Sequence, residues 1–306
     1  MSYLFLYPGQ GSQSVGMGKD FYETFGTVKK RIDEANEILG RDIRTLMFAG
    51  PEDELKATQN TQPALFAVEA AITDVLQEKG ITPVCAMGHS LGEYSALYAA
   101  GIFSFEDGLQ IVAKRGELMA EAGVQSRGAM AAVIGLSREV IAGVLSEITD
   151  GVVVPANENT PEQIVISGDI PGIDAAFGKL TEAGAKRVVR LPVSGAFHSP
   201  LMQPAADAFQ PFLDAFTFNT PQCPVISNVT ARPETDQSVI KGLLVKQLLS
   251  PVRWVDSVAE ADRQEIERYL EVGPGSVLKG LVRKCNRERN VVSCNTVDNL
   301  YFLADN

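Results

Sequence analysis

The segment Gly88-His89-Ser90-Leu91-Gly92 contains the residues best suited to chemistry, because it matches the G-x-S-x-G pattern of a nucleophile elbow. The apolar run 84–87 before it predicts a buried strand, and the residues from Leu91 onward predict a helix. In that setting the serine occupies a strained turn and projects its hydroxyl from the end of a sheet. The N–H of Leu91 points to the same place, where it can stabilise an oxyanion. We therefore predict Ser90 as a nucleophile, the alternative being a structural tight turn.

A serine nucleophile needs a base, and the chain has only two histidines, His89 and His198. His89 lies inside the turn beside Ser90, so its side chain should project away from the serine and serve a structural role. His198 lies in the segment 194–200, Ser-Gly-Ala-Phe-His-Ser-Pro, and is the remaining candidate base. The competing interpretation of His198 is a helix-capping or core histidine.

The third member of a triad is not evident from the residues. Acidic residues between the serine and the histidine would follow the order seen in α/β-hydrolases. Four are available, namely Asp107, Asp150, Asp169 and Asp174. None stands at a recognisable strand end, and a backbone carbonyl could orient the imidazole instead. The choice between a triad and a Ser–His dyad stays open at this point.

Two further residues are candidates for the same site. Gln10 lies in the glycine-rich segment 8–13 after the first predicted strand, where it could offer hydrogen-bond donors near Ser90. A phosphate loop is the alternative, but the G-x-x-x-x-G-K-[ST] pattern is absent. Arg115 lies on a helix predicted over 105–122. It is equally compatible with a surface arginine and with a buried guanidinium that binds a carboxylate through two hydrogen bonds.

The elements that must position these residues alternate between strand and helix, which predicts an α/β fold with a parallel sheet. A strand is expected at 3–7, a helix from about 19 to 39, and a helix at 63–79 with Pro63 in its first turn. From about 128 to 191 the order is βαββαβ, the ferredoxin-like arrangement. We therefore expect an inserted subdomain at 126–194 within a larger unit made of 1–125 and 195–306.

Composition narrows the functional class. The 306 residues include 27 Lys and Arg against 38 Asp and Glu, a net charge of −11, which argues against nucleic-acid binding and against an anionic membrane surface. Four well-separated cysteines give neither zinc-finger spacing nor a disulfide framework, so no metal site is expected. With no transmembrane run and no signal peptide, we expect a cytoplasmic protein.

Seven motifs together resemble the malonyl-CoA:acyl-carrier-protein transacylases of fatty acid synthesis, over essentially the whole chain. In order, they are Phe5-Leu6-Tyr7-Pro8-Gly9-Gln10-Gly11-Ser12-Gln13, Thr61-Gln62-Pro63-Ala64-Leu65, Gly88-His89-Ser90-Leu91-Gly92-Glu93-Tyr94, Lys114-Arg115-Gly116, Gly195-Ala196-Phe197-His198-Ser199, Gln247-Leu248-Leu249-Ser250-Pro251-Val252-Arg253-Trp254 and Glu271-Val272-Gly273-Pro274-Gly275. The resemblance implies an α/β-hydrolase-like large subdomain with a ferredoxin-like insertion.

The resemblance also implies a role for each matching position. Ser90 would be the acylated nucleophile and His198 the general base and acid, with Gln10 and the Leu91 N–H in the oxyanion-hole region. Arg115 would bind the malonyl carboxylate. The backbone carbonyl of Gln247 would orient the histidine, which implies a dyad. Three further positions would surround the acyl pocket: Gln62, Met119 and Phe197. Ala196-Phe197-His198 is similar to the malonyl-selecting form of its motif.

The implied substrates are malonyl-CoA and phosphopantetheinylated acyl carrier protein, with no bound cofactor, and we expect a monomer. The alternatives are a trans-acting acyltransferase of a polyketide assembly line, a serine thioesterase or hydrolase on the same elbow, and an inactive docking module. An acidic carrier protein needs a basic face despite the global charge of −11. Residues 279–289 carry a net charge of +4, and Lys186, Arg187 and Arg190 form a second cluster. A solvated helix face is the alternative interpretation for each.

Overall fold

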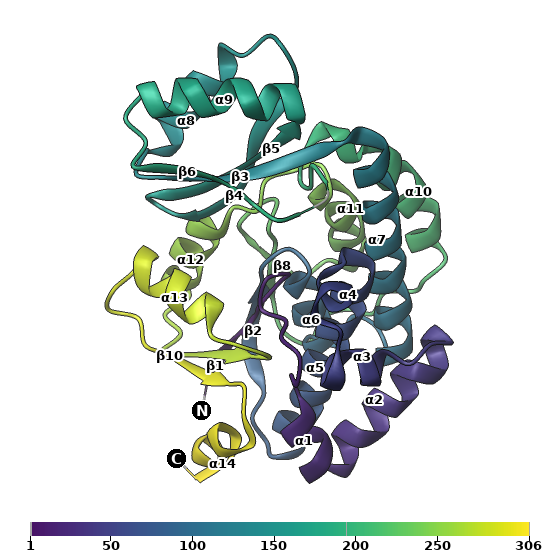
Figure 1. Cartoon of the computed structure of the whole chain (residues 1–306). Coiled ribbons are helices and arrows are strands. Elements are labelled where there is room, and N and C mark those ends of the chain that lie inside the picture. Colours follow the sequence, from purple (N-terminus) through teal and green to yellow (C-terminus); the bar gives the residue numbers. More distant parts are fainter. Residues whose placement is uncertain (1, 194, 306) are drawn as a thin grey trace.

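The computed structural model describes residues 2–193 and 195–305, which form two sheets with their helices (Figure 1). In this part of the chain sheet A has six strands in the order β10-β9-β1-β2-β7-β8. Its strands are β1 (Tyr3–Tyr7), β2 (Pro83–Gly88), β7 (Val225–Ile226), β8 (Pro233–Glu234), β9 (Arg268–Val272) and β10 (Val291–Cys294). All neighbours pair in parallel except β7 and β8. The expected parallel sheet is confirmed.

The side chains of β1 explain why helices cover both faces of sheet A. All five residues of β1 are buried. Tyr3, Phe5 and Tyr7 belong to one apolar cluster, whereas Leu4 and Leu6 belong to another on the opposite face. The first cluster includes side chains of α5 (Thr58–Glu78), α6 (Gly92–Ala99) and α7 (Phe105–Ser126), and the second includes those of α12 (Trp254–Arg263) and α13 (Val277–Cys285).

Two of the expected helices differ from those observed. The helix expected over 19–39 is two helices, α1 (Lys19–Thr24) and α2 (Gly26–Leu39), because Phe25 between them adopts an extended backbone. The helix expected from Pro63 begins at Thr58, so Pro63 lies inside α5 and not in its first turn. Proline lacks the N–H that would bond the carbonyl of Gln59, and that carbonyl accepts a hydrogen bond from Arg41 Nη2 instead (2.9 Å).

The insertion forms sheet B, whose strand order is β4-β5-β3-β6 with every neighbouring pair antiparallel. Its elements follow the expected βαββαβ order: β3 (Gly128–Ile134), α8 (Arg138–Ser146), β4 (Val153–Thr160), β5 (Gln163–Asp169), α9 (Ile170–Glu182) and β6 (Arg187–Arg190). Along β3, Ala131 and Val133 pack with α8 and α9, while Met130 and Ala132 face the large unit. The boundaries expected at 126 and 194 stay predictions, and Ser194 itself lies outside the described residues.

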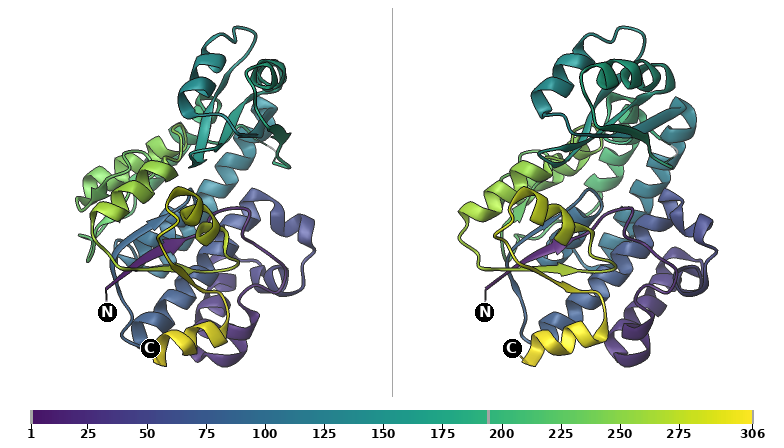
Figure 2. Two further views of the ribbon diagram at one scale, coloured as in Figure 1. Left: turned by 90° about the vertical axis from the view of Figure 1, so that its left-hand side faces the viewer. Right: turned by 60° about the vertical axis from the view of Figure 1, so that its left-hand side comes forward.

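Sheet B stands at the carboxyl edge of sheet A, as the two views of Figure 2 show. Backbone hydrogen bonds join the two units: the N–H of Val252 donates to Ala156 O (2.8 Å), and the N–H of Glu158 donates to Val252 O (2.9 Å). Arg138 of α8 forms ion pairs with Glu158 of β4 and with Asp256 of α12. The junction therefore holds the insertion against the edge where Ser90 lies.

The remaining elements were not all expected from the sequence. They are α3 (Ile43–Ala49), α4 (Glu52–Lys56), a 3₁₀ turn η1 (Pro200–Met202), α10 (Gln203–Asp214), α11 (Gln237–Gln247) and α14 (Val297–Asp305). The tail from 299 had no interpretation in the sequence, and most of it is α14, whose Leu300 and Leu303 join the main core. In the described part of the chain, no helix is both long and apolar enough to cross a membrane.

Candidate functional site

Ser90 occupies a sharp turn between β2 and α6, with a backbone φ of +52° that non-glycine residues rarely adopt. The glycines on either side make the turn possible. A Cβ on Gly88 would lie 2.0 Å from the Gly92 carbonyl carbon, and a Cβ on Gly92 would lie 2.0 Å from the Tyr7 oxygen. The strained turn therefore presents the Ser90 hydroxyl at the end of β2, which is the geometry of a nucleophile elbow.

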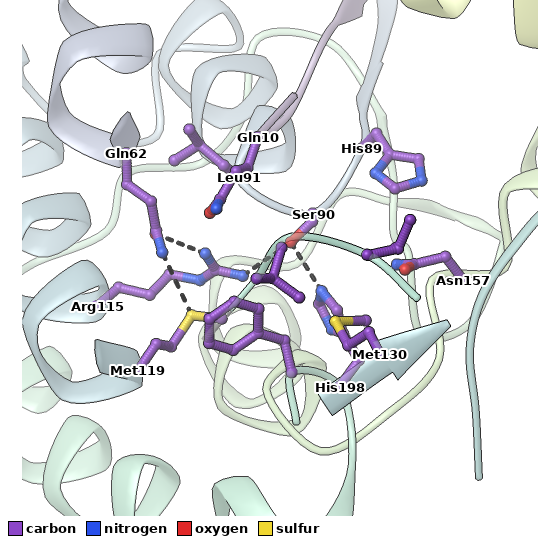
Figure 3. A pocket seen from close by; sticks show the side chains of 13 residues that line it. Gln10, Gln62, His89, Ser90, Leu91, Arg115, Met119, Met130, Asn157 and His198 are labelled. Atoms are coloured by element: carbon purple, nitrogen blue, oxygen red, sulfur yellow. Dashed lines mark hydrogen bonds between the residues drawn. The ribbon is translucent and has the colours of Figure 1, made fainter. Parts of the chain in front are cut away.

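The Ser90 hydroxyl contacts the one histidine that the sequence left as a base (Figure 3). Ser90 Oγ lies 2.8 Å from His198 Nε2, and His198 Nδ1 lies 2.8 Å from the backbone oxygen of Gln247. Because a carbonyl only accepts, Nδ1 carries the proton, and Nε2 is free to accept from the serine. His198 also has a left-handed backbone, with φ +59°. Ser90 and His198 therefore meet in the arrangement that a dyad requires.

Burial and the nearby guanidinium keep His198 neutral. Desolvation in the buried site, followed by the positive charge of Arg115, lowers the pKa of His198 to about 3. The imidazole is therefore an unprotonated acceptor throughout the neutral pH range, as a general base must be before the reaction begins.

None of the four acids that were available for a triad contacts His198. Asp107 lies in the first turn of α7, Asp169 caps α9 by accepting from the Gly172 N–H, and Asp174 pairs with Arg190. Asp150 lies in the turn before β4. The carbonyl of Gln247 lies at His198 Nδ1 where a triad would place an acid, and this geometry favours the dyad that the resemblance implied.

His89 points away from the serine (Figure 3). Its Nε2 lies 2.8 Å from Asn159 Oδ1 on β4, and its ring centroid is 5.6 Å from that of Trp254. Burial lowers its pKa, so the ring is neutral. Its contacts therefore connect the elbow to the insertion and to α12.

Arg115 is buried, with 1% of its surface exposed, and the surface-arginine interpretation is wrong. Its terminal nitrogens donate to Gln62 Oε1 (2.6 Å), Gln247 Oε1 (2.9 Å) and Ser90 Oγ (3.1 Å). Its guanidinium carbon lies 5.2 Å from the centroid of the Tyr94 ring. It pairs with no carboxylate of the described residues, and its Nε has no partner among them. A desolvated cation thus lies beside the serine hydroxyl with no carboxylate of the described residues bonded to it, and Glu93 acts on it only at longer range.

A chain of side-chain amides and a hydroxyl links Arg115 to Gln10. Gln62 accepts from Arg115 and donates through Nε2 to Thr58 Oγ1 (2.9 Å), and Thr58 in turn donates to Gln10 Oε1 (2.9 Å). The side chain of Gln10 is therefore engaged away from the serine. Its backbone N–H and that of Leu91 have no partner among the described residues. These two N–H groups, at the ends of neighbouring parallel strands, are the available oxyanion donors.

A cavity of about 120 Å³ lies in front of Ser90. The predicted pocket residues Gln62, Met119 and Phe197 line it. Gln62 Nε2 also contacts Met119 Sδ at 3.4 Å, which fixes both side chains. The sequence did not predict the remaining apolar wall, which comes from the insertion: Met130, Leu191 and Val193. The cavity thus has a polar floor at sheet A and an apolar cover at sheet B.

Two polar residues around the elbow were assigned no role from the sequence. Asn228 Oδ1 accepts from the Ser90 N–H (2.7 Å), and Asn228 Nδ2 donates to Gly88 O (2.7 Å). Glu93 accepts from Gln247 Nε2 (2.6 Å) and from the Asn228 N–H (3.2 Å). Asn228 follows β7, the parallel neighbour of β2. Its position at a strand end could have predicted a place in the site, but only with knowledge of the strand order.

Comparisons with known proteins agree with this geometry. The model of the acyl transferase domain family matches residues 4–301. A malonyl CoA-acyl carrier protein transacylase of Bacillus subtilis (strain 168) is 46% identical over 291 residues, 94% of this chain and 92% of that protein. The chain belongs to the malonyl CoA-acyl carrier protein transacylase family. The resemblance inferred from the seven motifs is confirmed, and the protein is an acyltransferase.

Solved structures of the family confirm the fold class. An acyl carrier protein S-malonyltransferase from Vibrio cholerae superposes with a TM-score of 0.96 at 43% identity, over 99% of this chain and 100% of that one. A malonyl-transacylase solved in complex with its type II PKS acyl-carrier protein gives a TM-score of 0.96 at 40% identity, over 100% and 99% of the two chains. The chain therefore has the α/β-hydrolase-like large unit with a ferredoxin-like insertion that the resemblance implied.

Proposed function

We propose that this acyltransferase moves the malonyl group from malonyl-CoA to the phosphopantetheine thiol of acyl carrier protein, through a malonyl ester on Ser90, in fatty acid synthesis. The observation that carries the proposal is the buried guanidinium of Arg115 beside the Ser90 hydroxyl, with no carboxylate of the described residues paired to it. An acyl group that ends in a carboxylate supplies the missing anion. The names of the related proteins support the same substrate.

Ser90 and His198 perform the first half of the reaction. Ser90 Oγ attacks the thioester carbonyl while its proton passes to His198 Nε2, 2.8 Å away. The carbonyl oxygen takes the negative charge and faces the free N–H groups of Gln10 and Leu91. When the C–S bond breaks, the CoA sulfur takes the proton from Nε2. The second half runs in reverse, with the carrier thiol as the nucleophile and Ser90 Oγ as the leaving group. No step uses a cofactor.

Arg115 holds the malonyl carboxylate during both halves. Gln62 and Gln247 each occupy one N–H of its two terminal nitrogens, and a guanidinium has two N–H groups on each. One of the remaining N–H groups points to Ser90 Oγ, and esterification makes that oxygen a poorer acceptor. The malonyl carboxylate can then accept hydrogen bonds from both of the N–H groups that Gln62 and Gln247 do not use. The held acyl group fills the narrow cavity and disfavours attack by water.

The basic surface formed by α13 and the residues just after it is the surface we assign to the carrier protein. Arg283, Lys284 and Arg287 are exposed, line a groove of about 790 Å³ with residues 160–163, and form no ion pair within the described chain. The second basic cluster is less available, because Lys186 pairs with Glu162 and Arg190 with Asp174. An acidic partner therefore meets uncompensated charge at α13. The monomeric state and cytoplasmic location stay predictions.

One two-stage experiment tests the proposal. The enzyme is incubated with malonyl-CoA, and the intact protein is weighed by mass spectrometry before and after holo-acyl carrier protein is added. A malonyl adduct should form, should be absent in Ser90→Ala, and should pass to the carrier protein, more slowly at high salt because exposed charges are screened. Release of free malonate without a carrier would support a hydrolase instead. Carrier proteins of polyketide synthesis are tested in parallel. Faster transfer to these than to the carrier protein of fatty acid synthesis would support the polyketide alternative.

A further inference from the structure

Among the described residues, Glu93 is the buried carboxyl that contacts hydrogen-bond partners of both Ser90 and Arg115, and the reaction steps above leave it without a role. It lies in the first turn of α6, three residues after Ser90, and is 3% exposed. Its Oε2 accepts from Gln247 Nε2 at 2.6 Å and from the Asn228 N–H at 3.2 Å. A buried carboxyl with two well-placed donors is a specific arrangement.

The contact with Gln247 is the shortest of those that set which way that side-chain amide points. An amide has an accepting oxygen and a donating nitrogen, and the two ends differ little in shape. An ionised carboxylate only accepts, so it requires the Gln247 NH₂ group on its side. The amide oxygen then faces the opposite way, where it accepts from Arg115 Nη2 at 2.9 Å. Ser90 O favours the same direction by accepting from Gln247 Nε2 at 3.0 Å.

We propose that Glu93 is a positioning residue, which fixes the direction of the Gln247 amide so that its oxygen holds the Arg115 guanidinium in the orientation that receives the malonyl carboxylate. The proposal rests on the malonyl transfer proposed above. Among the described residues, Glu93 is hydrogen-bonded neither to Ser90 Oγ nor to Arg115, and it acts through Gln247. Its consequence is selection: a carboxylated acyl group depends on Glu93, whereas an acetyl group, which does not use Arg115, does not.

Glu93 titrates near neutral pH, and several other charged or titratable groups lie around it. Burial raises the pKa of Glu93 to about 7, against the opposing effects of its hydrogen bonds and of Arg115 on α7. Burial raises the pKa of Tyr94 beside it and holds the pKa of His198 at about 3. On the adjacent α5, burial raises the pKa of Glu69 well above its usual range. A neutral Glu93 at pH 6 can donate as well as accept, and so no longer fixes the amide direction.

Glu93→Gln tests the proposal, because glutamine keeps the shape and one acceptor but offers an NH₂ group to Gln247. We expect KM for malonyl-CoA to rise about tenfold while kcat changes less than about threefold, and KM for acetyl-CoA to stay within about twofold. Glu69→Gln is the matched control. It changes an equally buried acid that accepts from Ser95 at 2.5 Å, outside the site, and should leave both KM values unchanged.

A second measurement uses the native enzyme, so it does not depend on whether the Glu93→Gln variant folds. KM for malonyl-CoA should rise as the pH falls from about 8 to about 6, through the protonation of Glu93, while KM for acetyl-CoA stays flat. In Glu93→Gln the malonyl profile should be flat at the raised value. His198 does not change charge in this interval, because its pKa lies at about 3, so it does not produce the same profile. The malonyl profile of Glu69→Gln should match that of the native enzyme if Glu69 makes no contribution.

Three results with Glu93→Gln would overturn the proposal: an unchanged malonyl KM, equal losses for malonyl-CoA and acetyl-CoA, or a malonyl KM that falls. The last would make Glu93 a competing anion for Arg115 and not a positioning residue. A pH-independent malonyl KM in the native enzyme would also contradict it. Failure of the proposed function is a separate result, because the native enzyme would then form no malonyl-Ser90 adduct, or would release free malonate in place of passing the adduct to the carrier protein.

Discussion

The carboxyl edge of sheet A and the inner face of sheet B supply different kinds of side chain to the same cavity. Sheet A places polar groups at the ends of three neighbouring parallel strands: Gln10 after β1, Ser90 after β2 and Asn228 after β7. Sheet B supplies Met130 of β3, and the segment after β6 adds Leu191 and Val193. The polar contribution of sheet B to the cavity is Asn157.

This difference assigns chemistry to one unit and shape to the other. Parallel strands end at one edge, so residues far apart in sequence meet there with their backbone N–H groups directed at a single point. In antiparallel sheet B, helices α8 and α9 cover one face, and the other, apolar face is free to cover the cavity. Changes in the large unit should therefore abolish the reaction or its selectivity, and changes in the insertion should alter which acyl groups fit.

The largest effect should come from His198, on the segment that returns from the insertion. His198→Ala removes the group that accepts the Ser90 proton, and we expect the rate of malonyl loading to fall about 10³- to 10⁴-fold. Rapid-quench measurement of the acyl-enzyme gives this rate. His89→Gln is the comparison variant, with a much smaller loss, because His89 bonds Asn159 and not the serine. Loading within about tenfold of the native rate would remove His198 as the base.

Arg115 should give the next largest effect, and one restricted to carboxylated substrates. In Arg115→Ala two charge-assisted hydrogen bonds to the malonyl carboxylate are lost, together about 3 kcal/mol, which is more than a hundredfold in kcat/KM. Acetyl-CoA should lose less than about tenfold, because it does not use the guanidinium. Steady-state assays with the two thioesters measure the ratio. A parallel loss for both would show that Arg115 supports the site structurally and does not select the acyl group.

The elbow could be predicted from the sequence because its signal is local, and the candidate base because the chain has few histidines. A strand, a G-x-S-x-G turn and a helix are contiguous, and with two histidines in the chain the base followed by exclusion. The state of Arg115 could not be decided in this way. Its burial depends on how α5, α7 and α11 pack around it, and Gln62 and Gln247 lie 53 and 132 residues away along the chain.

The partners of the elbow were missed for a related reason. Glu93 stands within a recognised motif, but its function depends on Gln247, which is 154 residues away. The helix expected over 19–39 was wrong at Phe25 because apolar spacing continues across the break, where the ring joins the core edge. The predicted start of α5, at Pro63, was five residues too late because the first turns of this helix bury polar residues such as Thr58 and Thr61. Periodicity of apolar residues does not register polar groups that are buried for a site.

The smallest effect on the reaction should come from the insertion, and it sharpens the division between the two units. Met130→Ala enlarges the cavity by shortening its apolar cover, so malonyl loading should fall less than about threefold, while loading of branched acyl-CoA thioesters should increase.

Val133→Ala is the matched control on the same strand. Val133 points to the other face of β3, among α8 and α9, so its truncation should reduce thermal stability and leave acyl preference unchanged. Competition assays with mixed acyl-CoA substrates measure the preference. If Met130→Ala lost malonyl loading as severely as Arg115→Ala, the insertion would have to take part in the chemistry, and the division proposed here would fail.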